Sequence, residues 1–176
     1  ATRRVPGVRF EAVCDIWPYN RQRAGGRLRA YRHGHAMYED YREMLAKEKG
    51  LDAAIVATPD CWHAEHTIAC LEAGLHVYCE KEMSNTLEGA RSIVEAARAS
   101  DRLVQIGHQR RSNPFYHHAL QLIEKDNALG QLTNCYGQWN RAAQPKAQVP
   151  EKLRIPREVL EKYGYGTMER FRNWRW

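Results

Sequence analysis

Short apolar runs alternate with helix-like segments over residues 8–125, and no other feature constrains the fold as strongly. The segments between the runs carry apolar residues every three or four positions, which is typical of helices. Strands and helices that alternate at roughly 30-residue spacing form βαβ units. We therefore predict an α/β fold with a doubly wound parallel sheet. Its strands are expected at residues 8–14, 53–57, 75–79 and 103–106.

The helices are predicted from apolar periodicity and from signals at their ends. Asn85 and Glu88 resemble a capping box at the start of one helix. Gly50 and Gly74 are expected to end two others. The run at residues 53–57 is apolar throughout, which suits a strand buried on both faces. The five helices are expected at about residues 20–32, 38–49, 63–73, 85–99 and 114–125.

The pattern changes after the last of these helices. Residues 132–139 form a β-like run, and a loop-rich segment with several prolines follows from Arg141 onward. We place a domain boundary near residue 127. It divides the chain into one domain of residues 1–127 and a second of residues 128–176.

Charge and hydropathy exclude several classes of protein. The chain has 27 Lys and Arg against 21 Asp and Glu, for a net charge of +6. The basic residues are scattered and no nucleic-acid-binding module is recognisable, so we expect no nucleic-acid partner. No apolar stretch approaches the roughly 18 residues of a membrane span, so we expect no membrane partner.

The cysteines indicate a reducing compartment. There are five, an odd number, at irregular spacings. The spacing of Cys61, His63 and His66 matches no standard zinc pattern, so we expect no metal. We expect a cytoplasmic protein, although any export signal would precede Ala1.

Polar or turn-forming residues follow each predicted strand, at the end where open parallel sheets bind ligands. Asp15 suits hydrogen bonds to a ribose diol, and its structural alternative is a turn or helix-capping Asp. Lys81 suits acid–base chemistry beside Glu80, and its alternative is a surface lysine. The residues at these ends are Asp15, 58–60, 80–81 and 107–109.

The glycine-rich phosphate loop of dinucleotide-binding sheets is missing from the sequence. No G-x-G-x-x-G follows a strand, and Gly164 and Gly166 follow a charged helical stretch instead. Two explanations stay open at this point. Either the protein does not bind a dinucleotide, or the turn that carries the loop lies upstream of Ala1.

Several segments, in the right order and spacing, resemble the Gfo/Idh/MocA family of NAD(P)-dependent oxidoreductases. That family has an N-terminal Rossmann domain and a C-terminal α+β domain, which holds much of the substrate site and often the oligomer interface. The resemblance implies an incomplete Rossmann domain over residues 1–127, the start of the second domain over 128–176, and a homo-oligomer. The matching segments are residues 12–15, 38–45, 57–60 with 62–63, 73–81, 107–111 and 173–176.

The resemblance also implies site residues. Asp15 would contact the adenosine ribose, which favours NAD over NADP. Lys81 would lie near the nicotinamide and the substrate hydroxyl and is the expected catalytic residue, with a further His and Asp expected beyond Trp176. The other cofactor-binding residues that it implies are Thr58, Pro59, His63, Glu80, Gln109, Trp174 and Arg175.

The chain departs from the family pattern in two ways. Glu82 stands where the family's Glu-Lys-Pro motif has Pro, and we interpret this as a variant branch of the family. The family's first strand and glycine loop would precede Ala1. In the usual strand order that strand lies between those at residues 8–14 and 53–57, so we expect these two not to pair with each other.

The function that the resemblance implies is hydride transfer between NAD(P) and a carbinol of a sugar, cyclitol or related polyol. Two alternatives stay open. One is an NAD-dependent glycoside-cleaving enzyme of the same fold, which oxidises the sugar transiently and eliminates the glycosidic bond. The other is a non-catalytic NAD- or sugar-binding protein.

Overall fold

The computed structural model of the protein describes residues 6–140 and 150–173. The chain divides into two compact units, one of residues 1–106 together with 148–176, and one of residues 107–147. Each unit is described by itself. The division into domains of residues 1–127 and 128–176 stays a prediction.

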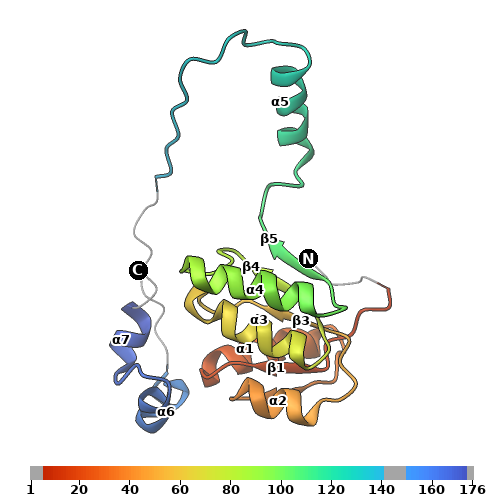
Figure 1. Ribbon diagram of the computed structural model, residues 1–176. Coiled ribbons are helices and arrows are strands. Elements are labelled where there is room, and N and C mark those ends of the chain that lie inside the picture. The colour runs from red at the N-terminus through yellow and green to blue at the C-terminus, as the bar shows by residue number, and fades with distance from the viewer. Residues whose placement is uncertain (1–5, 141–149, 174–176) are drawn as a thin grey trace. The chain divides into compact units, whose positions relative to one another are not determined.

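Strands and helices alternate along the chain (Figure 1). The strands are β1 (Ala12–Cys14), β2 (Ala36–Tyr38), β3 (Ala53–Val56), β4 (His76–Glu80) and β5 (Val104–Gly107). The α-helices are α1 (Pro18–Ala30), α2 (Tyr41–Lys47), α3 (His63–Glu72), α4 (Leu87–Ala99), α5 (Pro114–Glu124), α6 (Arg157–Lys162) and α7 (Met168–Asn173). Two short 3-10 helices are η1 (Asp60–Trp62) and η2 (Glu151–Leu153). None of the described helices has the length and apolar character needed to cross a bilayer.

The strands form two parallel sheets, which confirms the α/β class. One sheet pairs β1 with β2, and the other has the order β3-β4-β5. The register between β3 and β4 runs from Ala53 opposite His76 to Val56 opposite Cys79. Among the described residues β1 and β3 belong to different sheets, so the prediction that these two strands do not pair with each other is confirmed.

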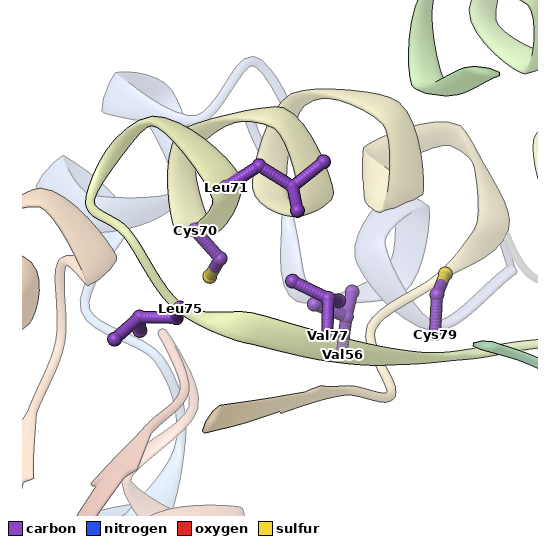
Figure 2. Close-up of a cluster of buried hydrophobic side chains, with 6 residues drawn as sticks. All are labelled: Val56, Cys70, Leu71, Leu75, Val77 and Cys79. Carbon is purple, nitrogen blue, oxygen red and sulfur yellow. The ribbon is translucent and has the colours of Figure 1, made fainter. Parts of the chain in front are cut away.

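The main hydrophobic core lies between α3 and the sheet of β3 and β4. In Figure 2 the Cys70 side chain of α3 points toward the strand that carries Val77 and Cys79. Leu71 is 4% exposed and Val77 3% exposed. Burial of side chains of this size stabilises the fold by roughly 1.5–3 kcal/mol each. The buried members are Val56, Cys70, Leu71, Leu75, Val77 and Cys79.

A second core joins residues 150–173, the C-terminal segment, to the N-terminal part of the same unit. Trp17, directly before α1, packs edge-on against Phe171 of α7 at a ring-centroid distance of 5.6 Å. The indole N–H of Trp17 donates to the carbonyl oxygen of Leu153 at 2.9 Å. The buried members of this core are Trp17, Ile155, Leu160, Tyr165 and Phe171.

Local details of two predicted elements are wrong. Tyr38 was expected to begin a helix, but it ends β2, a strand that the periodicity did not predict. Three residues are too few to show a period of two, and this strand depends on its pairing with β1. Asn85 does not cap α4. The cap is Thr86, whose hydroxyl oxygen accepts from the N–H of Gly89 at 3.0 Å.

The strand predictions are wrong in three respects: the length of one strand, the burial of another, and the existence of a third. Of the predicted strand at residues 8–14, only Ala12–Cys14 forms a strand. Ile55 was expected to be buried, but it is 57% exposed, because α3 covers the opposite face of β3 and shields Val56. Residues 132–139 form no strand, since they have no neighbouring strand among the described residues with which to pair.

Candidate functional site

The carboxyl ends of β1, β3 and β4 carry the candidate site residues of the first unit that the structure describes, except His63, which begins α3. Turn-forming or charged residues follow each strand directly. In open parallel sheets this is the edge at which ligands bind.

Asp15 follows β1 and organises the turn into α1. Its Oδ1 accepts from the backbone N–H of Trp17 at 2.7 Å, and its Oδ2 accepts from the side-chain amide of Asn20 at 2.9 Å. The guanidinium of Arg21 donates to the Asp15 carbonyl oxygen. The structural role foreseen for this residue, a turn aspartate, is therefore realised.

Thr58 and Pro59 follow β3 and lead into η1. The Thr58 hydroxyl lies 3.1 Å from Nδ1 of His66 on α3. Pro59 has an extended backbone conformation directly before η1. Burial lowers the pKa of His66 to about 4, against a smaller opposing effect of the Glu65 carboxylate. His66 is therefore neutral near pH 7, and its ring fixes the orientation of the Thr58 hydroxyl.

His63 is the first residue of α3 and is 1% exposed. Its Nε2 lies 2.7 Å from the carbonyl oxygen of Thr58. Its Nδ1 lies 2.5 Å from the carbonyl oxygen of Glu82. The ring therefore connects the residues that follow β3 with those that follow β4.

Glu80, Lys81 and Glu82 lie at the end of β4. An oxygen of the Glu80 carboxylate accepts from the backbone N–H of Lys81 at 3.3 Å. The Lys81 ammonium donates to the Glu82 carboxylate at 3.0 Å, and both side chains are exposed. The peptide bond between Lys81 and Glu82 is cis. The residue that replaces the family's Pro thus provides a partner for the lysine.

The structure brings several of the sequence-predicted residues of the first unit together. His63 touches the backbone of Thr58 and of Glu82, and this places the Thr58 loop and the Lys81 loop side by side. Gln109 belongs to the second unit, where it is exposed in a turn. Trp174 and Arg175 lie outside the described residues.

The sequence did not predict the aromatic contacts between the C-terminal segment and the residues that follow β1 and β3. The indole N–H of Trp62 donates to the Tyr165 hydroxyl at 2.7 Å. The Trp62 ring also stacks on His66 at a centroid distance of 6.0 Å. The sequence shows tryptophans next to two of the strand ends, but it does not show what they contact. Trp62 bonds to a residue 103 positions away, and Trp17 to one 136 positions away.

Asp40 is a second anchor of that segment. One oxygen accepts from the backbone N–H of Arg42 at 2.9 Å, which caps α2. The other accepts from the Lys162 ammonium and the Tyr163 hydroxyl, each at 3.3 Å. Burial alone would raise the pKa of Asp40. The Arg42 N–H and the two nearby cations outweigh it and hold that pKa below its usual value.

The comparison with protein families gives the class. Residues 2–108 match the sequence pattern of the Gfo/Idh/MocA oxidoreductase family with an NAD-binding Rossmann fold. This match covers more than half of the chain, and the parallel sheets and strand-end residues agree with it. The chain belongs to this family.

Two relatives with substantial identity to the chain are named as inositol dehydrogenases. The inositol 2-dehydrogenase of Rubrobacter xylanophilus is 35% identical over 141 residues, which cover 80% of this chain and 38% of that protein. The inositol 2-dehydrogenase/D-chiro-inositol 3-dehydrogenase of Shouchella clausii is 34% identical over 124 residues, or 70% of this chain and 35% of that protein. The chain thus spans less than two-fifths of the length of these two relatives.

Solved structures agree on the fold. The myo-inositol 2-dehydrogenase of Lactobacillus plantarum superimposes with a TM-score of 0.64 at 24% identity, over 73% of this chain and 36% of that one. The WlbA dehydrogenase of Bordetella pertussis, solved with NADH and UDP-GlcNAcA, gives a TM-score of 0.58 at 27% identity. That match covers 65% of this chain and 33% of the other.

Proposed function

We propose that the protein is an NAD-dependent oxidoreductase that oxidises a carbinol of a cyclitol or related polyol. The observation that carries this proposal is the 35% identity to an inositol 2-dehydrogenase over most of the chain. The position of Lys81 supports it: the residue directly follows the parallel strand β4, where a lysine can act as an acid or a base.

The chemistry of the strand-end residues fits a nicotinamide dinucleotide. The Asp15 carboxylate, at the end of β1, suits a ribose diol. Thr58, Pro59, Glu80 and Lys81 offer hydroxyl, backbone, carboxylate and ammonium groups at the neighbouring strand ends. Gln109, Trp174 and Arg175 stay part of the proposed cofactor set on the strength of the family pattern alone. When bound, the nicotinamide supplies the hydride acceptor.

The proposed role of Lys81 is to bind the reacting hydroxyl and to help move its proton. Oxidation of a carbinol breaks a C–H and an O–H bond, so the hydride leaves to the cofactor and the proton must leave to a base. A lysine amine is a suitable acid–base group when its charge can be lost near neutral pH. The resemblance adds a histidine of a second domain as a further base.

The test of this role is Lys81→Ala in the natural protein that carries these residues. We expect kcat for oxidation of myo-inositol to fall by at least about a hundredfold, the lower end of the usual contribution of general acid–base catalysis. NAD binding, measured by titration calorimetry, should persist. An unchanged kcat would remove Lys81 from the mechanism.

The substrate class is tested by following NADH formation with a panel of inositols, sugars and glycosides. Net NADH from a free cyclitol or sugar is the expected result. Cleavage of a glycoside without net NADH would favour the transient-oxidation alternative. NAD binding without exchange of label into nicotinamide C4 would favour a non-catalytic protein. A homo-oligomer, a cytoplasmic location and the preference for NAD over NADP stay predictions of this proposal.

A further inference from the structure

His63 makes two contacts that a neutral imidazole cannot satisfy together. Its Nε2 faces the Thr58 carbonyl oxygen at 2.7 Å, and its Nδ1 faces the Glu82 carbonyl oxygen at 2.5 Å. A backbone carbonyl oxygen only accepts hydrogen bonds. A neutral imidazole has one N–H and one lone pair, so either tautomer would turn its lone pair toward an oxygen at hydrogen-bonding distance.

Water cannot relieve this conflict, because the side chain is 1% exposed. A buried polar atom that faces a group of its own kind loses its hydration and gains no bond in return. The doubly protonated imidazolium has donors at both nitrogens and resolves both contacts at once.

His66, one turn further along α3, shows the contrasting case. Its Nδ1 lies 3.1 Å from the Thr58 hydroxyl, a group that can donate as well as accept. A neutral ring is therefore compatible with that contact. The two histidines share a helix and a neighbour, Thr58, but only the contacts of His63 require a doubly protonated ring.

The placement of His63 gives its charge a structural consequence. The ladder between β3 and β4 ends at the pair Val56 and Cys79. The ring bridges Thr58 and Glu82, beyond the ends of both strands. It therefore links the two loops that carry the proposed cofactor and catalytic residues, at the point where strand pairing stops.

We propose that His63 is a positioning residue that is held as an imidazolium, and that its two charged hydrogen bonds fasten the loop after β3 to the loop after β4. The relevance of these loops to cofactor binding rests on the proposed function, whereas the protonation state does not. This role differs from direct contact with the cofactor, which was the expectation from the sequence.

The surroundings of the ring are consistent with this assignment. The titratable neighbours are the Cys79 thiol on β4, His66 on α3, and Lys81 and Glu82, which pair with each other. Burial opposes the charge, but Cys79 and the two carbonyl oxygens outweigh it and raise the pKa of His63 to about 9. Because the folded-state pKa exceeds the ordinary 6.5, the contribution of His63 to stability is complete below about pH 6.5 and is lost as the pH rises through about 9.

The direct test is nitrogen NMR of the histidine rings in the ¹⁵N-labelled chain between pH 5 and 10. His63→Gln and His66→Gln assign the two signals. At pH 7.5 we expect His63 to show the two similar ¹⁵N shifts of an imidazolium and His66 the two distinct shifts of a neutral ring. A neutral His63 at that pH would overturn the proposal. If His63→Gln does not fold, single His→Gln variants of the other seven histidines identify the His63 signal of the wild type by elimination.

The positioning role is tested by the pH dependence of NAD affinity in the natural protein. In the wild type we expect affinity to fall by about tenfold between pH 7.5 and 10, as a charged hydrogen bond is lost. His63→Gln, whose amide offers donors on only one of its two polar atoms, should bind about tenfold more weakly at pH 7.5. Its own affinity should change little with pH.

Partial recovery of NAD affinity in His63→Lys, which keeps a charged donor, would support the role of the charge. Equal pH dependence in the wild type and in His63→Gln would overturn it. Failure of every variant, and of the wild type, to bind NAD would instead contradict the proposed function and leave the NMR result standing.

Discussion

Two residues of the candidate site are bonded to close neighbours in the sequence. Lys81 pairs with Glu82, which occupies the position of the family's Pro. Asp15 accepts hydrogen bonds from Trp17 and Asn20 within its own turn. The sequence offered two interpretations of Asp15, a ribose ligand or a turn residue. The structure realises the second and leaves the first as a proposal.

The Lys81–Glu82 ion pair should contribute little to stability. The two side chains are 40% and 63% exposed, so water screens their attraction. We expect Glu82→Gln to change the free energy of unfolding by less than about 0.5 kcal/mol in urea titrations. Lys81→Met removes the other charge of the same pair and should change the free energy of unfolding by a similarly small amount. A loss well above 1 kcal/mol in Glu82→Gln alone would contradict the exposed-pair description.

The ends of two helices follow local sequence signals. α3 ends just before Gly74, whose φ of +82° is a conformation that glycine adopts without strain. α5 begins at Pro114 after Asn113, whose side chain accepts from the N–H of Phe115. The start of α4 was misplaced by one residue, because Asn85 and Thr86 are both good caps and only the backbone conformation distinguishes them.

The capping of α4 is directly testable. Thr86 accepts from the Gly89 N–H at 3.0 Å, whereas the structure gives no cap bond to Asn85. We expect Thr86→Ala to destabilise the fold by about 1 kcal/mol, measured by thermal or urea unfolding. Asn85→Ala should stay within about 0.5 kcal/mol of the wild type. The reverse order of the two effects would restore the capping box predicted from the sequence.

The whole first unit is held together by contacts between distant parts of the chain. The C-terminal segment reaches Trp17, Asp40 and Trp62, three positions in the N-terminal half. Two of these lie within four residues of Asp15 or Thr58. The segment therefore stabilises the same strand ends that carry the candidate site.

The Asp40 anchor should make this docking sensitive to acid. The pKa of Asp40 lies below its usual value, so its contribution is complete above about pH 4 and is lost as the pH falls through the folded-state pKa. Asp40→Asn keeps a capping oxygen for Arg42 but loses the charge that attracts Lys162. We expect the stability difference between the wild type and Asp40→Asn to shrink from pH 7 to about pH 3 in urea titrations.

Two further measurements sharpen this experiment. Lys162→Met removes the cation instead, and its stability difference from the wild type should shrink over the same pH range. Limited proteolysis should cleave the segment 150–173 faster in both variants at neutral pH. A stability difference that does not change with pH would show that the Asp40 charge contributes nothing to docking.

Local sequence by itself determined the α/β class and, to within one residue, the carboxyl ends of β1, β3, β4 and β5. These follow from apolar periodicity and from turn residues such as Gly74, which act over a few neighbouring positions. Periodicity also predicted a strand at residues 132–139, which did not form, because a strand needs a partner as well as a pattern.

Only the tertiary structure decided what the site residues touch. The charge on His63 depends on two carbonyl oxygens, of which one lies 19 residues further along the chain. The contact of Trp62 with Tyr165 spans 103 residues. Hydrogen-bond partners and burial depend on which distant backbone lies beside a side chain, and no local pattern carries that information.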